Sequence, residues 1–128
     1  MRKLPLAFCT TAALFGMAGM IWGMLMAKSE DFTMAPAHAH LNLLGWATPA
    51  VMGSFYALVG DRASNRLGWL NYILSTGGVI AIIPALAMLL KGDKAATPIV
   101  AAGAGIVFLG MVVFLIDVLL LWRAPKKA

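Results

Sequence analysis

The segment 67-LGWLNYILSTGGVIAIIPALAMLL-90 decides the fold, because it carries no charged side chain and is long enough to cross a bilayer as a helix. A transmembrane helix needs roughly 20 mainly apolar residues to span the hydrocarbon core. Three further stretches meet this criterion, and they are Leu4–Met26, Ala39–Val59 and Pro98–Trp122. In lipid, every backbone polar group must be satisfied internally, which favours helices. We therefore predict an all-α polytopic membrane protein, a four-helix bundle.

The composition supports a membrane protein over a soluble one. The chain has 128 residues, of which 62% are hydrophobic and 12% are charged, and its mean hydropathy is +0.89. A soluble domain of this length buries too little surface to hide so much apolar material. A transmembrane barrel would need alternating polarity along each strand, and the apolar stretches lack it. Because the connections are short, we predict a single transmembrane domain over residues 1–128.

The first apolar stretch follows two basic residues, Arg2 and Lys3, as the apolar part of a secretory signal peptide does. The stretch is longer than the apolar region of a typical signal peptide, and no small-x-small cleavage site closes it. We therefore expect it to form a transmembrane helix.

The net charge of +5 comes from basic residues at the ends of the apolar stretches, where such residues set membrane topology. This placement does not predict a nucleic-acid surface. Most of the basic residues lie at the N-terminus, in the 60–66 loop and in the C-terminal tail. The positive-inside rule therefore predicts that both termini are cytoplasmic, in a bacterial inner (cytoplasmic) membrane. His38 and His40 then lie near the outer face.

His38 and His40 are the strongest functional candidates, since polar groups at membrane depth are unfavourable and often functional. Residues two apart on a helix point to nearly opposite sides, so an undistorted helix cannot bring both to one metal ion. An imidazole at the edge of the membrane core suits an axial ligand of haem iron. Trp46 offers an aromatic wall for a porphyrin. The alternative is that both histidines lie in the interface and bond to water or to the 28–37 loop.

The segments 37-AHAHL-41 and 50-AVMGSF-55 resemble the tenth helix of subunit I of the haem-copper oxidases. The segment 40-HLNLL-44 resembles the second helix of the nitric oxide reductase and cbb-type branch of that family. The resemblance implies that His40 is an axial ligand of a low-spin haem b. Through the tenth-helix comparison alone, it implies that His38 is an axial ligand of a second haem. It also implies that the chain corresponds to one four-helix arc of subunit I.

The chain departs from the family pattern at the copper site. The family holds its catalytic copper with three further histidines, whereas this chain has two histidines in total. We therefore expect no copper centre and assign no catalytic residue, and whether the protein is an oxidoreductase stays open. Three arcs make up subunit I, which suggests a homotrimer with haem clamped head-to-tail between His40 of one copy and His38 of the next. The alternative is a dimer with one haem between two copies of His40.

Two functions follow from these residues. The first is a haem-b-binding membrane protein of the haem-copper oxidase lineage, active in electron transfer or in gas or redox chemistry. The second is a non-catalytic accessory or transition-metal-binding protein with a ring of histidines at an oligomer axis. Asp117 is the one acidic residue within an apolar stretch. Because it lies close to Trp122 and Arg123, we expect an interfacial position for it and not a role in proton transfer.

Overall fold

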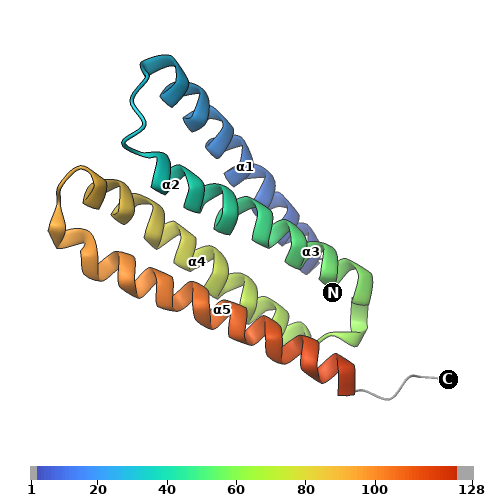
Figure 1. Ribbon diagram of the computed structural model, residues 1–128. Helices are drawn as coiled ribbons and strands as arrows, with labels where there is room; N and C mark the ends of the chain where they lie inside the picture. The colour runs from blue at the N-terminus through green and yellow to red at the C-terminus, as the bar shows by residue number, and fades with distance from the viewer. Residues whose placement is uncertain (1–2, 124–128) are drawn as a thin grey trace.

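The computed structural model describes residues 3–123 and is almost entirely helical (Figure 1). Four helical spans are long and apolar enough to cross a membrane, which confirms the predicted fold class and suggests a bilayer environment. Arg2, Lys126 and Lys127, which contribute to the predicted charge bias, lie outside the described residues. The elements are α1 (Lys3–Ser29), α2 (Ala35–His40), the π-helix η1 (Leu41–Ala47), α3 (Thr48–Val59), the 3-10 helix η2 (Gly60–Arg62), α4 (Asn65–Leu90), the 3-10 helix η3 (Lys94–Ala96) and α5 (Thr97–Arg123).

The second span begins earlier than the apolar pattern predicts, at Ala35 and not at Ala39. Pro36 occupies the first turn, where its missing N–H leaves no bond unmade. At the other side of the loop, α1 continues to Ser29 and ends where Glu30 takes a left-handed conformation with φ of 56°. Hydropathy alone cannot find these ends, because the outer turns of a helix extend beyond the apolar core.

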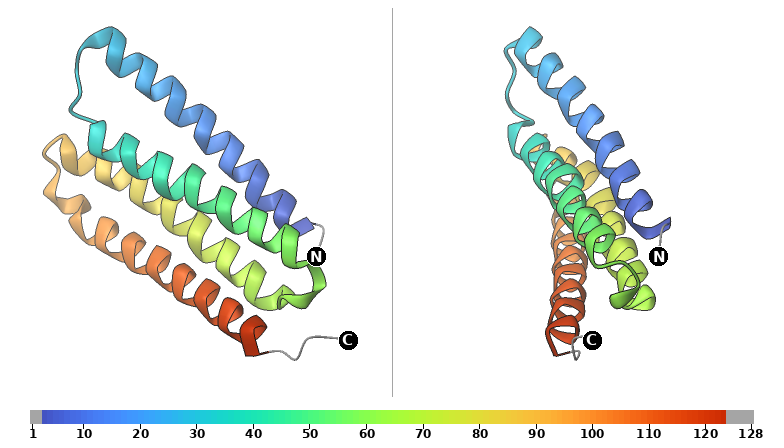
Figure 2. Two further views of the ribbon diagram at one scale, coloured as in Figure 1. Left: turned by 45° about the vertical axis from the view of Figure 1, so that its right-hand side comes forward. Right: turned by 90° about the vertical axis from the view of Figure 1, so that its right-hand side faces the viewer.

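The spans form two antiparallel hairpins, one of α1 with α2–η1–α3 and one of α4 with α5 (Figure 1). The right-hand view of Figure 2 shows α1 and α5 on opposite sides of the molecule, and α1 contacts both the second span and α4. Both ends of the described chain and the α3–α4 turn lie at one end of the molecule. We call this the terminal end, and the opposite one the loop end.

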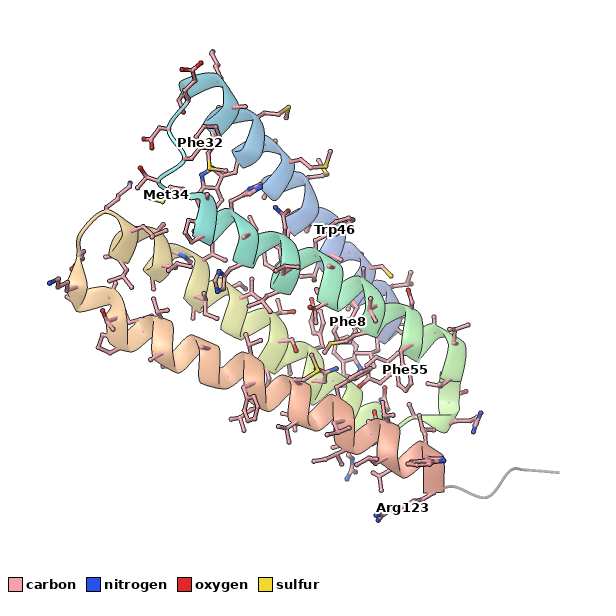
Figure 3. All side chains as sticks on the ribbon, viewed as in Figure 1. Phe8, Phe32, Met34, Trp46, Phe55 and Arg123 are labelled. Atoms are coloured by element: carbon pink, nitrogen blue, oxygen red, sulfur yellow. The ribbon has the colours of Figure 1, made fainter. Side chains whose placement is uncertain are left out.

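An aromatic core joins the two hairpins near the terminal end. Phe8 of α1 and Tyr56 of α3 are fully buried, and their rings stack with centroids 5.6 Å apart. Phe55 meets Phe114 of α5 edge-on at 5.0 Å, and Phe8 meets Tyr72 of α4 edge-on at 5.1 Å. Figure 3 shows Phe8 and Phe55 in this region. Edge-to-face and stacked pairs at these distances stabilise a core beyond simple burial.

Buried polar groups strengthen the same core. The amide nitrogen of Asn71 donates to the Tyr56 hydroxyl at 3.3 Å, which links α4 to α3. The Ser75 hydroxyl donates to the side-chain oxygen Oδ1 of Asn71 at 2.9 Å. Thr11 and Tyr72 share a hydrogen bond of 2.7 Å between α1 and α4. Hydrogen bonds between helices hold membrane helices together where apolar burial gives little driving force.

Asp117, for which the sequence predicts an interfacial position, is buried within the protein, with 1% of its surface exposed. Its Oδ1 accepts a hydrogen bond of 3.0 Å from the backbone N–H of Ser64, the residue that caps α4. Its Oδ2 is buried without a hydrogen-bond partner among residues 3–123. The carboxylate therefore ties α5 to the start of α4, where the helix dipole also favours negative charge.

Helices α4 and α5 approach closely because glycines lie at their contact. A methyl group added to Gly78 would meet Val107 Cγ2 at 2.5 Å and the backbone nitrogen of Val107 at 3.0 Å. Gly103 lies opposite, and its added methyl would meet Ile82 Cγ1 at 2.6 Å. Such small-residue contacts let membrane helices pack backbone to backbone.

We predict that Gly78→Ala destabilises the protein by about 1–3 kcal/mol, because the methyl group would push the two helix backbones apart. Gly77→Ala is the matched control, since no atom lies within 4 Å of the methyl group that it adds. Thermal unfolding in detergent, followed by circular dichroism, measures both variants. Equal unfolding temperatures for the two variants would contradict close packing of α4 on α5.

We predict that Asp117→Ala destabilises the protein by about 1–3 kcal/mol, because the Ser64 N–H would be left without its acceptor. Asp117→Asn keeps an acceptor oxygen and removes a buried charge, so its unfolding temperature should stay close to that of the unmodified protein. The same thermal measurement distinguishes the two variants. A loss in the Asn variant as large as in the Ala variant would mean that the charge itself holds the helices.

Candidate functional site

The candidate site lies where the second span changes from an α-helix to a π-helix, directly after His40. The π-helix η1 has 7 residues, Leu41–Ala47, and Thr48 is its C-terminal cap. Pro49 follows, and a proline ring clashes with the carbonyl four residues earlier, here that of Gly45. The backbone N–H of Thr48 instead bonds five residues back, to the carbonyl of Leu43. The Thr48 hydroxyl donates to the same carbonyl at 2.7 Å.

A local π-helix with a back-bonding threonine is one way in which a transmembrane helix accommodates a proline. Short π-helical segments also occur frequently at functional sites. The sequence signal for the π-helix is the pair Thr48-Pro49 in the middle of an apolar span. The apolar pattern alone does not distinguish a π-helix from an α-helix.

His40 has an exposed side chain whose ring is fixed by its own helix. Its Nδ1 lies 2.8 Å from the carbonyl oxygen of Pro36, one turn earlier. Because a carbonyl oxygen only accepts hydrogen bonds, Nδ1 carries the proton and donates it. The neutral ring therefore has its lone pair on Nε2, and the exposed position leaves this nitrogen accessible. Fixing one ring nitrogen on a carbonyl in this way orients the other as a ligand.

His38 has different surroundings, because its ring is half-buried against α1. The amide nitrogen of Asn42 lies 3.0 Å from Nε2 and 3.5 Å from Nδ1 of His38. An amide nitrogen can only donate, so the nearer atom, Nε2, accepts this hydrogen bond. Trp22 of α1 meets the His38 ring edge-on, with centroids 6.4 Å apart. The lone pair that would bind a metal ion is thus already in use.

The face of the second span that carries His38 packs against a row of glycines on α1. The ring of His38 lies over Gly23, with Cε1 3.1 Å from the point where a Cβ would be. The Asn42 amide group lies over Gly19, and the Trp46 indole lies over Gly16. His38, Asn42 and Trp46 follow one another at intervals of four, so they form one packing face, which we call the α1-facing row.

The three residues predicted as one site, His38, His40 and Trp46, therefore do not lie on one face of the helix. His38 and Trp46 belong to the α1-facing row, whereas His40 lies outside it on an exposed surface. Figure 3 shows Trp46 beside α1, and half of its surface, 52%, is exposed. Asn42 was not predicted as a site residue, although its position four residues after His38 is the spacing at which helical side chains meet. Within residues 3–123 no three His, Cys, Asp or Glu side chains lie together as ligands for a metal ion.

Comparison with protein-family models, with curated proteins and with solved structures gives no match for this chain. The resemblance to the haem-copper oxidases therefore rests on the residues of the second span alone.

Proposed function

We propose that the protein binds haem b in a bacterial cytoplasmic membrane, with His40 as an axial ligand, and that it transfers electrons. The observation that carries this proposal is the His40 ring itself. Its Nδ1 is held on the Pro36 carbonyl at 2.8 Å, and its exposed position leaves Nε2 available. A metal-bound histidine almost always donates its other ring N–H to a carbonyl, a carboxylate or water in this way.

The surroundings of His40 fit a cofactor that lies against the outside of one chain. An exposed imidazole within an apolar span is unfavourable in lipid unless something covers it. Two hydroxyls farther along the same span are satisfied within their own helix, since Thr48 bonds to the Leu43 carbonyl and Ser54 bonds to the Ala50 carbonyl. His40 Nε2 has no such bond to any residue of 3–123, which supports a ligand at this nitrogen. When bound, haem would supply one-electron chemistry, and His40 would hold and orient it.

The second axial ligand must then come from another copy of the chain. A head-to-tail trimer would use His38 of the neighbour, and this would require breaking the Asn42 bond and lifting the ring from Gly23. A dimer with haem between two copies of His40 requires neither change. The geometry therefore favours the dimer over the trimer that the resemblance to three arcs suggests.

Electron transfer is the activity that this arrangement supports best. Two copies of His40 would hold the iron, and His38, the other histidine of the chain, is held against α1 by its bond to Asn42 and is not free to bind a copper ion. The charge bias, with both termini cytoplasmic, would put His40 toward the outer face. The exchange of electrons would then occur on that side of the membrane.

We predict that the purified protein shows the Soret band and the reduced α and β bands of a low-spin haem b, and that His40→Ala lowers haem occupancy by about tenfold or more. His38→Ala and Asn42→Ala are the matched controls, since both residues lie in the α1-facing row. They should keep the low-spin spectrum. Absorption spectra of the oxidised and reduced protein, with haem content per chain, give the measurement.

Mass measurement of the detergent-solubilised complex tests the assembly, for which we expect two chains and one haem. Loss of the low-spin spectrum in His38→Ala as well as in His40→Ala, together with three chains, would support the head-to-tail trimer. A preparation that stays colourless after haem is added would overturn the proposal in favour of a non-catalytic accessory protein.

A further inference from the structure

A cavity of about 560 Å³ opens at the loop end, on the opposite side of the molecule from the aromatic core. Three segments that are separate in the sequence enclose it: the last turns of α1, the 30–34 loop and the turn after α4. In the views of Figure 2, α1 and the α4–α5 hairpin lie farthest apart at this end. The cavity therefore lies between the last turns of α1 and the turn after α4, where these two helices diverge.

The walls of the cavity are mostly apolar. Trp22 and Leu25 of α1 line it, and the thioether side chains of Met26 and Met34 complete the wall. Helix α1 has 27 residues and is about 40 Å long at 1.5 Å per residue, which exceeds the roughly 30 Å of a hydrocarbon core. Its last turns, and with them the mouth of the cavity, thus reach the depth of the lipid headgroups. An apolar opening at this depth is filled best by a hydrocarbon chain.

The rim of the cavity carries two ammonium groups, one from each hairpin. Lys28 ends α1 and Lys91 follows α4, and neither forms an ion pair among the described residues. One carboxylate, Asp31, also lies on the rim. Its Oδ1 accepts hydrogen bonds from the hydroxyl and the backbone N–H of Thr33, at 2.6 and 3.0 Å. These bonds hold the pKa of Asp31 below its usual range, so it stays ionised. The rim has one net positive charge.

We propose that this cavity binds one anionic phospholipid from the adjoining leaflet. Its acyl chain lies along Trp22, Leu25 and Met26, and its phosphate diester lies between Lys28 and Lys91. A bound lipid would bridge the end of α1 and the turn after α4, which diverge at this end of the molecule. It would also lie against Trp22, whose ring contacts His38. The proposal does not depend on haem binding at His40.

Native mass spectrometry of the detergent-solubilised protein, titrated with dioleoylphosphatidylglycerol, tests this site. We expect one tightly bound lipid per chain and weaker binding of dioleoylphosphatidylcholine, whose headgroup has no net charge. Each lysine near a membrane surface strengthens the attraction of an anionic lipid about fivefold, so Lys28→Gln with Lys91→Gln should weaken binding about 20-fold or more. Lys94→Gln is the matched control, because Lys94 follows in η3 and does not line the cavity.

Leu25→Trp tests the acyl-chain part of the site, because a larger side chain would fill the wall while leaving both lysines in place. It should weaken phosphatidylglycerol binding without changing the unfolding temperature measured without lipid. If the double lysine variant does not fold, each single variant should show about a fivefold loss. Equal binding of the two lipids, or unchanged binding after loss of both lysines, would overturn the proposal. Displacement of the lipid by millimolar inorganic phosphate would also overturn it, since the site would then recognise a free anion.

Discussion

The absence of water at membrane depth is the constraint on which the rest of this structure depends. Each backbone N–H and C=O within the spans must find a partner inside the protein, which makes every span a helix. The same constraint explains the π-helix. Pro49 removes one donor and crowds one carbonyl, and the chain responds by bonding Thr48 to the Leu43 carbonyl through both its N–H and its hydroxyl. It also accounts for Asp117, whose carboxylate satisfies the Ser64 N–H at a turn that is packed against α5. The π-helix and the buried Asp117 thus complete the hydrogen bonding of the backbone within the spans.

Close approach of helices then decides which polar side chains stay accessible. The row of Gly16, Gly19 and Gly23 brings α1 so near to the second span that His38 and Asn42 pack on the α1 surface and bond to each other. His40, two residues away, falls outside that contact and keeps one ring nitrogen accessible. The distinction between a packing histidine and a candidate ligand is therefore made by glycines on a different helix. His38 and His40 are the same type of residue at nearly the same position in α2. The sequence of their own helix therefore does not tell which of the two packs against α1.

The four spans could be predicted from the sequence because their signal is an average over many residues, and an average tolerates local exceptions. The divergence of His38 and His40 could also be predicted, since it needs only the helical repeat. The role of Asn42, the π-helix and the burial of Asp117 could not. Each depends on one specific contact between residues far apart in the sequence or on one local change of helical pitch. The neighbours of Asp117 in α5 do not reveal its burial, because the Ser64 N–H that its carboxylate contacts lies in the turn before α4.

The two ends of the molecule differ in how they are held together. At the terminal end, stacked and edge-on aromatic rings, the Tyr56–Asn71–Ser75 hydrogen bonds and Asp117 join both hairpins. At the loop end, α1 and the end of α4 diverge around a cavity that no side chain of residues 3–123 fills. Regions with few buried contacts open most easily, and binding sites are drawn from them. His40 and the lysine-rimmed cavity both lie in the half of the molecule toward the loop end. The proposed cofactor and lipid would therefore bind away from the aromatic core that joins the two hairpins at the terminal end.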